Sequence, residues 1–493
     1  MCNWKTGMDM MNRTLRCLFG CFAVFLSCVG GENIYAEETG VGLIGGFVGS
    51  TPAAYGAIVV NGSVSSNILS ASTSLNSVAL NDLGVGLVGG AHSGVYSVVS
   101  HNGVSTTVTP ITPDQSASRL NYVAINSSGV GLIGGTDASL NTYVAVVSGG
   151  VATAVSNLIL GSVIEGVAIS DSGMGIIGGS YRISAGPLAY AALVSGGVAS
   201  SNLLALDANS EILSVAINSS DVGLIGGYDT AGGAYVAIIY NGTVYPLSLS
   251  LSGSIESVAI NDSGVGLIGG IGNGGAYAAR LVISGTTATV TPIPGLPTGN
   301  ALIYSVAIDS YGAGIIGGRD GNNTAFAALV DNLAVPTTID TSLGSGSIIY
   351  SASINDFGFG LIGGIDGTGL AYAALVDDQG VPTRLVQHTG QITSVSLSNY
   401  ASVPITISGF RLNDDFVVVS ELFNVLSWNN PLPQQIASYQ LLRNGTLIAL
   451  LGSNATSYED HNRLCTETDV YILNAYDALD NLLGTASITI YGK

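Results

Sequence analysis

One short phrase recurs along most of the chain, and it limits the fold more than any other feature. It has the form Ser-Val-Ala-Ile-Asn, and a glycine-containing turn and a second phrase close to Val-Gly-Leu-Ile-Gly-Gly follow it. The first phrase stands at residues 77–81, 122–126, 166–170, 214–218, 257–261, 305–309 and 351–355. The second ends at Gly46, Gly90, Gly135, Gly179, Gly227, Gly270, Gly318 and Gly364, at intervals of 43 to 48 residues. A period of this length indicates a propeller, a solenoid or another repeat array.

Each repeat divides into four short strand-like pieces, here called strands a to d. Strand a is the first phrase and strand b the second, strand c centres on Ala-Tyr-Ala-Ala-Leu-Val, and strand d follows a turn such as Asn241-Gly242. Asn-Gly between two apolar runs is a strong signal for a tight hairpin. Four strands in about 40–50 residues are typical of a propeller blade. A parallel β-helix, whose coils usually need fewer residues, is the alternative fold.

The first and last repeats are incomplete in complementary ways. The first copy begins with strand b at residues 41–46, and an additional strand a at residues 394–398 has no second phrase behind it. A propeller closes in this manner, because the last strand completes the first blade and removes an exposed edge. The sequence therefore predicts an all-β protein, an eight-bladed β-propeller closed by a split first blade and followed by a small β-sandwich.

Two features inside the repeat are interpreted as structural. The Gly-Gly pair that ends strand b is expected to allow a close backbone approach or a bulge. Strand c carries one aromatic residue in each copy, and phenylalanine replaces tyrosine once, which favours packing between blades over a ligand role for the hydroxyl. These residues are Tyr55, Tyr96, Tyr143, Tyr190, Tyr235, Tyr277, Phe326 and Tyr372.

The loops between strands b and c, together with the d–a connections on the same face, are the candidate binding surface. They lie on the opposite face of the expected ring from the a–b and c–d turns, and they vary in length, as variable recognition loops on a rigid scaffold do. In four copies an aspartate stands two residues after the Gly-Gly pair: Asp137, Asp229, Asp320 and Asp366. Carboxylates here suit Ca²⁺ or a basic partner surface, whereas turn formation by aspartate is the structural alternative. The four belong to different blades, so we expect no single metal site and no cofactor.

The alternation of Val-Ala-Ile-Asn, Gly-Leu-Ile-Gly and Ala-Tyr-Ala-Ala-Leu-Val resembles the HAF-type extracellular bacterial repeats, which are thought to form propeller-like domains. The resemblance covers residues 38–409, and the His and Trp of that family's third strand are absent from this chain. It implies an extracellular location and a propeller-like fold rather than a particular activity.

Composition changes after Gly409, and residues 412–493 resemble a fibronectin type III module. Residues 426–428 with the following Pro431 and Pro433 resemble strand B of such a module, residues 436–445 resemble strand C and its turn, and residues 456–460 resemble strand E. Residues 471–477 resemble strand F, which places Tyr471 near the tyrosine-corner position and Trp428 in the core. Such modules are usually spacers or binding units.

The first 36 residues have the pattern of a secretion signal. Arg13 and Arg16 precede an apolar run, and Ala36 offers a cleavage site. We expect a mature chain that begins near Glu37, with Met11 as an alternative start and a lipid-anchored start at Cys28 as an alternative fate. The mature chain keeps only Cys465, so no internal disulfide is expected.

Little in the sequence indicates catalysis. The net charge is −20, which makes nucleic acid an improbable partner. The histidines His92, His101, His388 and His461 form no metal-binding spacing, and no catalytic motif has a credible partner set. The sequence thus predicts a non-enzymatic scaffold, secreted, periplasmic or on the cell surface. We expect it to be monomeric, to lack a membrane-spanning segment once mature, and to bind an unknown protein or glycan. A propeller-based carbohydrate-active lyase or hydrolase is the alternative.

Overall fold

The computed structural model describes residues 40–49, 53–60, 62–65, 74–90, 97–100, 105–107, 119–137, 139, 141–399, 407–416, 419–429, 436–464, 466–476 and 482–491. Within these residues the regular structure is strand, and no helix is long and apolar enough to cross a membrane. Some of the residues named in the predictions above are not among those described. The signal segment 1–36 with Cys28, and also His92, Tyr96, His101 and Cys465, lie outside the described residues.

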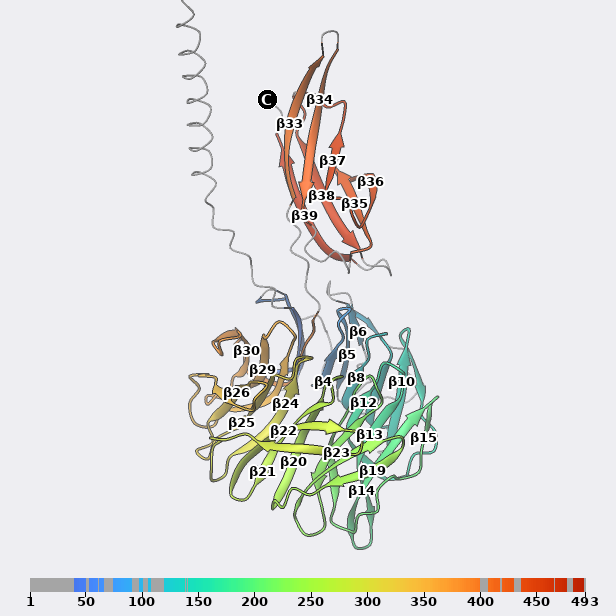
Figure 1. Ribbon diagram of the computed structural model, residues 1–493, viewed down its shortest axis with the longest axis vertical. Coiled ribbons are helices and arrows are strands. Elements are labelled where there is room, and N and C mark those ends of the chain that lie inside the picture. The colour runs from blue at the N-terminus through green and yellow to red at the C-terminus, as the bar shows by residue number, and fades with distance from the viewer. Residues whose placement is uncertain are drawn as a thin grey trace, which may run out of the picture. The chain divides into compact units, whose positions relative to one another are not determined.

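Residues 41–397 form eight four-stranded antiparallel sheets (Figure 1). Sheets 2 to 8 each consist of four consecutive strands: β4–β7, β8–β11, β12–β15, β16–β19, β20–β23, β24–β27 and β28–β31. Sheet 1 has the order β3-β2-β1-β32, so its members come from both ends of this region. Repeated four-stranded antiparallel sheets are the architecture of a β-propeller, and the predicted division of each repeat into strands a to d is confirmed.

The strand bounds follow the repeat closely. Strands a are β4 (Leu75–Leu80), β8 (Arg119–Ile125), β12 (Ser162–Ile169), β16 (Glu211–Ile217), β20 (Gly253–Ile260), β24 (Leu302–Ile308), β28 (Ile348–Ile354) and β32 (Gly390–Leu397). Strands b are β1 (Val41–Val48), β5 (Val85–Gly90), β9 (Gly131–Thr136), β13 (Gly175–Ile183), β17 (Gly223–Tyr228), β21 (Val265–Gly272), β25 (Gly314–Arg319) and β29 (Gly360–Ile365).

Of the two remaining strands of each sheet, strands c are on average as long as strands a, and strands d are shorter. Strands c are β2 (Ala53–Val60), β6 (Ser97–Ser100), β10 (Thr142–Ser148), β14 (Gly186–Ser195), β18 (Ala234–Tyr240), β22 (Gly275–Ser284), β26 (Ala325–Val330) and β30 (Ala371–Val376). Strands d are β3 (Ser63–Val64), β7 (Ser105–Thr107), β11 (Val151–Ala154), β15 (Val198–Ala199), β19 (Thr243–Leu247), β23 (Thr287–Pro292), β27 (Pro336–Thr338) and β31 (Pro382–Val386).

The isolated strand a at the end of the repeats pairs with the first strand b. Strand β32 runs antiparallel to β1, from Gly42 opposite Leu397 to Val48 opposite Gly390. The edge of β1 that has no partner in its own repeat is therefore covered by a segment more than 300 residues away in the chain.

The hydrophobic core lies between consecutive sheets. Ile176 and Ala191 of sheet 4, for example, pack with Ile212 and Ile225 of sheet 5, and each of these side chains is fully buried. Burying one such isoleucine contributes about 1.5–3 kcal/mol. Because each sheet packs on both faces, strand b is almost entirely apolar or glycine, as is typical of strands without a solvent face.

The second glycine of each Gly-Gly pair lies against the backbone of strand a. A Cβ atom on Gly135 would be 1.9 Å from the carbonyl oxygen of Arg119, and one on Gly318 would be 2.0 Å from that of Leu302. At this point strand a contains a β-bulge, such as the one between Leu120 and Tyr122. Of the two alternatives expected at the Gly-Gly pair, the close approach is present at the pair itself, and the bulge lies in the facing strand a.

The first glycine of each pair makes room for the next sheet instead. A Cβ atom on Gly178 of sheet 4 would lie 2.5 Å from Cγ1 of Val215 in sheet 5, and one on Gly269 would lie 2.5 Å from Cγ1 of Val306. The valine of Ser-Val-Ala-Ile-Asn thus packs onto a glycine of the preceding sheet. The two glycines serve different contacts, which explains why both recur.

The aromatic residue of strand c stands directly opposite the second glycine. This pairing joins Gly46 with Tyr55, Gly135 with Tyr143, Gly179 with Tyr190, Gly227 with Tyr235, Gly270 with Tyr277, Gly318 with Phe326 and Gly364 with Tyr372. An aromatic side chain covers the space that a glycine leaves on a sheet. Tyr190 packs with Leu132 of sheet 3, and burial raises its pKa to about 12. For Tyr190, the predicted packing role between neighbouring sheets is confirmed.

Residues 407–490 form two further sheets (Figure 1). One has the order β33-β34-β37 and the other β36-β35-β38-β39. Their strands are β33 (Ile407–Phe416), β34 (Val419–Trp428), β35 (Ser438–Arg443), β36 (Thr446–Gly452), β37 (Ser457–Asp460), β38 (Asp469–Tyr476) and β39 (Leu482–Ile490). Strand β33 begins at Ile407, so this region starts before residue 412 and takes over the last residues of the predicted propeller range 38–409. Trp428 is buried and packs edge-on against Tyr439.

We predict that Gly318→Ala lowers the free energy of unfolding by about 2 kcal/mol or more, because the new methyl group meets the Leu302 backbone and not a movable side chain. Gly344→Ala is the matched control, since a Cβ atom there meets nothing within 4 Å. Chemical denaturation of both variants measures the difference. Equal midpoints would contradict this account of the Gly-Gly pair.

Candidate functional site

The four aspartates singled out from the sequence each begin a tight turn. Asp137, Asp229, Asp320 and Asp366 follow β9, β17, β25 and β29, and in each the Oδ1 atom accepts two backbone N–H groups, two and four residues further on. The N···O distances lie between 2.8 and 3.0 Å. Aspartate stabilises turns in this way because its carboxylate replaces a backbone acceptor.

The structure does not gather these carboxylates into one group. Across the described residues, no cluster of three or more His, Cys, Asp or Glu side chains is arranged to hold a metal ion. The same two-bond turn also occurs on the opposite side of the sheets, where Asp331 and Asp377 join strands c and d. Turn formation is therefore a general use of aspartate in this repeat.

Asp366 differs from the other three because it also forms an ion pair. Its Oδ2 atom lies 2.9 Å from Nη2 of Arg384, whose guanidinium group stands 5.2 Å from the centre of the Tyr372 ring. Burial raises the pKa of Asp366, but hydrogen bonds from Thr368, Arg384 and the backbone N–H of Leu370 outweigh it and lower the pKa to about 2. The loop of sheet 8 thus carries a guanidinium group and an aromatic ring beside a fixed carboxylate.

The longest b–c connection with described geometry is a hairpin and not an irregular loop. In sheet 4, β13 and β14 remain paired as far as Ile183 opposite Gly186. The additional residues that the sequence indicates between Gly179 and Tyr190 lengthen two strands beyond the rest of the sheet. The Ile183 side chain at the tip is exposed.

A cavity of about 250 Å³ lies at the other end of strands a, next to the a–b turns. Sequence reasoning did not place a site there. Its lining comes from the same three positions in consecutive sheets, such as Ile125, Asn126 and Ser127 of sheet 3. We call it the turn-end cavity; Leu80, Asn81, Asp82, Ile125, Asn126, Ser127, Ile169, Ser170, Asp171, Ile217, Asn218, Ser219, Ile260 and Asp262 line it.

In five of the eight sheets an asparagine ends strand a and joins its sheet to the next one; Ser170, Asp309 and Ser398 take this position in the other three. The asparagine Oδ1 atom accepts backbone N–H groups of its own turn, as Asn261 does from Ser263 and Val265. Its Nδ2 group donates to the carbonyl oxygen at the same position of the next sheet, from Asn81 to Asn126 and from Asn261 to Asp309. A buried amide with both ends bonded is well satisfied, so this residue is a structural connector.

We call the residue after this position the rim residue; it lines the cavity in sheets 2 to 6, and its identity alternates from sheet to sheet. Aspartate alternates with serine or asparagine in the order Asp82, Ser127, Asp171, Ser219, Asp262, Ser310, Asp356 and Asn399. Each serine or asparagine donates its backbone N–H to the carboxylate of the next sheet, at 2.8 or 2.9 Å. The rim is negatively charged on every second sheet, which attracts cations by charge alone. The sequence signal for this charged rim is the alternation of aspartate with serine or asparagine at this position in successive repeats.

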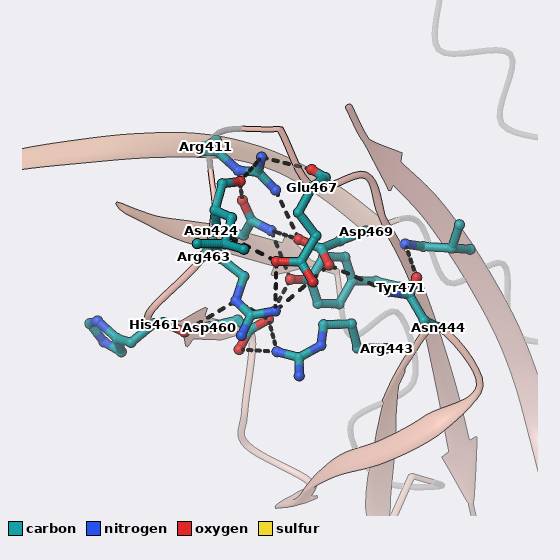
Figure 2. Close-up of polar contacts among 12 residues, drawn as sticks. Arg411, Asn424, Arg443, Asn444, Asp460, His461, Arg463, Glu467, Asp469 and Tyr471 are labelled. Atoms are coloured by element: carbon teal, nitrogen blue, oxygen red, sulfur yellow. Dashed lines mark hydrogen bonds and ion pairs between the residues drawn. The ribbon is translucent and has the colours of Figure 1, made fainter. Parts of the chain in front are cut away.

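A second cluster of polar side chains lies within the sheets of residues 407–490 (Figure 2). The fully buried Asp469 accepts from Arg411 at 2.8 Å and from Asn424 at 2.9 Å. Asp460 accepts from Nη1 of Arg443 through both of its oxygens, at 2.9 and 2.8 Å. Because buried charges are costly unless they are paired, these contacts identify a structural network that fixes how the two sheets meet.

Tyr471 lies at the centre of this network, near the start of β38 where the tyrosine corner was predicted (Figure 2). Its hydroxyl group donates to Asp460 at 2.5 Å and accepts from Asn424 at 2.8 Å. The partner is thus a side-chain carboxylate, whereas a tyrosine corner uses the backbone. Burial, with the Asp460 contact, raises the pKa of Tyr471.

No family model and no curated protein matches this chain. Among solved structures, the Dos1 propeller is 13% identical, with 72% of this chain and 92% of that chain covered and a TM-score of 0.45. Sqt1 of Chaetomium thermophilum, bound to the N-terminus of ribosomal protein L10, is 13% identical over 64% of this chain and 88% of that one, with a TM-score of 0.44. Virginiamycin B lyase from Staphylococcus aureus is 12% identical over 59% and 91%, with a TM-score of 0.42.

We predict that Asp366→Asn removes a pH-dependent part of the stability. A pKa of about 2 in the folded chain, against an ordinary value of 3.8, means that the ionised group stabilises the fold above about pH 4. This contribution, about 2 kcal/mol, declines as pH falls from 4 to 2, so the wild type and variant converge there. Asp377→Asn is the control, since Asp377 forms the same turn in this sheet but pairs with no arginine among the described residues. A wild-type advantage that is constant from pH 6 to pH 2 would contradict the prediction.

Proposed function

We propose that this chain is an exported or cell-surface scaffold, an eight-bladed propeller followed by a fibronectin type III-like module, which binds a protein or glycan partner through its b–c loops. It acts as a monomer and by binding rather than by catalysis. The observation that carries the proposal is the rigid construction of four of the candidate loops, each fixed by an aspartate before any partner arrives.

The proposed ring with sheet 1 as the split blade is supported by contacts between the first and last sheets. Leu361 and Ala373 of sheet 8 share a buried cluster with Ile44 and Ile392 of sheet 1. Strand β32 also contacts both β28 and β4, the strands a on either side of it. The backbone N–H of Val395 donates to Ser351 Oγ, and that of Val78 donates to Ser394 Oγ. The same serine contact links other neighbouring sheets, for instance Val258 with Ser214.

The proposed module is supported by its strand arrangement. Strands β34, β35, β37 and β38 coincide with the segments that resemble strands B, C, E and F, and they are divided between a three-stranded and a four-stranded sheet. Two antiparallel sheets of this kind, with a buried Trp, are typical of immunoglobulin-like sandwiches. Export rests on the sequence pattern of residues 1–36.

The b–c loops suit binding because their backbone is held in place. In Asp229 and Asp320, the two N–H bonds occupy Oδ1 and fix the five residues of each turn. A surface that is ordered beforehand loses less conformational entropy when a partner binds. Asp366 adds Arg384 and Tyr372 to the loop of sheet 8, and arginine and tyrosine are enriched among residues that dominate binding energy.

We predict that a chain ending at Asn399 keeps a cooperative unfolding transition, whereas a chain ending at Gln387 loses it or aggregates. The first truncation removes residues 407–490 but keeps β32, and the second also exposes the edge of β1 and the buried cluster around Ile392. Thermal unfolding and light scattering compare the two. If both truncations melt alike, sheet 1 does not close the structure and an open solenoid takes its place.

We predict that loosening the loops weakens partner binding. The full chain is screened on arrays of extracellular proteins and of glycans, and binding of a positive probe is then measured by interferometry. Asp229→Ala with Asp320→Ala is expected to weaken binding at least about fivefold, since the loops must then be ordered on binding. Asp331→Ala with Asp377→Ala removes the same turn bonds on the opposite side and is the control. Equal losses in both double variants would contradict binding through the b–c loops.

A further inference from the structure

Every strand a contains a β-bulge at the same place, opposite the Gly-Gly pair. The bulged residue is Asn76, Asn121, Glu165, Leu213, Glu256, Tyr304, Tyr350 or Thr393, in the order of the sheets from sheet 2 to sheet 8 and then sheet 1. We call these eight residues the bulge ring. Bulges redirect a side chain and are over-represented beside functional sites. This place lies toward the b–c end of the sheets, away from the turn-end cavity.

The bulge ring varies where the rest of strand a is constant. The residue before each bulge is a leucine or isoleucine that is 0 or 1% exposed, as Leu75, Ile212 and Ile303 show. All eight bulged residues are half-buried instead. Side chains that differ from sheet to sheet, on a frame that does not, are the arrangement expected of a specificity-determining surface.

Glu165 and Glu256 belong to a carboxylate sector whose partners are hydroxyl groups. Tyr122 donates to Glu165 at 2.6 Å, Tyr228 donates to the adjacent Glu211 at 2.9 Å, and Ser254 donates to Glu256 at 2.5 Å. Among the described residues, none of these carboxylates forms a salt bridge. Burial and the charge of Glu211 raise the pKa of Glu165 despite the Tyr122 bond.

The other two sectors are aromatic and neutral. The rings of Tyr304 and Tyr350 stand 6.0 Å apart at a tilt of 55°, and the guanidinium group of Arg319 lies 5.9 Å from the centre of the Tyr304 ring. Nδ2 of Asn76 donates to Oδ1 of Asn121 at 3.0 Å, and the Thr393 hydroxyl group donates to the Leu75 carbonyl oxygen at 2.7 Å. One ring therefore combines carboxylates, amides and two aromatic faces.

We propose that the bulge ring is a saccharide-binding site, which takes the terminal sugar of a neutral oligosaccharide. The inference rests on the proposed binding function and names its ligand class. Sugar hydroxyl groups both donate and accept hydrogen bonds, so they match carboxylates on one side and amides on the other. The apolar face of a sugar ring packs on Tyr304 or Tyr350, as apolar C–H groups do on aromatic side chains.

A cationic side chain fits the bulge ring less well than a sugar does. The ring of Tyr304 already has Arg319 beside it, so an incoming cation would meet a like charge there. The carboxylates already bond hydroxyl groups, which are the donors a sugar supplies. A site for a cation would also favour ionised carboxylates, whereas burial disfavours the charge on Glu165.

The test screens the full chain on an array of neutral oligosaccharides and measures the positive probe by calorimetry. Tyr304→Leu, which removes the aromatic face, and Glu256→Gln, which preserves size, are each expected to raise Kd about tenfold or more. The matched controls are Tyr311→Leu, whose side chain is 74% exposed in an a–b turn, and Asp378→Asn, which is exposed in a c–d turn. Each control is expected to change Kd less than about twofold, with unchanged thermal unfolding in all four variants.

Three results would overturn the inference. The first is that no oligosaccharide binds, and the second is that Tyr304→Leu and Glu256→Gln bind as the wild type does. The third is that a hexalysine peptide binds and loses affinity in Glu256→Gln while saccharides do not bind. The proposed function fails separately, because it depends on the Asp229 and Asp320 loops and not on Tyr304 or Glu256.

Discussion

The close approach of strand a to the second glycine of each pair is the contact on which the rest of this fold depends. A carbonyl oxygen of strand a occupies the space of the missing side chain, for example that of Ser254 at Gly270. Strand a bulges at this point, and the aromatic residue of strand c covers the other side of the glycine. One small residue thus sets the register of three strands. The same geometry directs the bulged side chain away from the core in every sheet.

This constraint separates the constant parts of the repeat from the variable ones. The valine, alanine and isoleucine of strand a pack between sheets and have little freedom to change. The bulged residue, the residue of the rim and the b–c connection do not enter these clusters. Glu256 and Tyr304, in successive sheets, occupy equivalent places with different chemistry. The chemistry of the bulge ring is therefore set by a few positions per repeat.

Much of the fold was predictable because the same sequence pattern recurs in eight repeats. The four strands, the Asn241-Gly242 hairpin and the packing role of Tyr190 all follow from local rules, and the structure has them, including positive φ values at Asn241 and Gly242. The bulge ring was not predicted, since Glu165 and Tyr304 lie outside the recurring phrase and look unrelated in the sequence. The turn-end cavity was missed because Asn81 and Asn126 are adjacent only through contacts between sheets. The start of the C-terminal sheets at Ile407 was not predicted, because the change in composition that marked the boundary begins only after Gly409, inside strand β33.

The alternation at the rim has a consequence for how such a chain gains or loses length. Asp262 accepts a backbone N–H from Ser219 of the sheet before it, and Asp356 accepts one from Ser310. A sheet with aspartate and a sheet with serine therefore form one unit at this end, although a single sheet is the unit everywhere else. Removing one sheet would bring two carboxylates or two serines side by side. Growth by pairs preserves the pattern, so the number of sheets is expected to change by two.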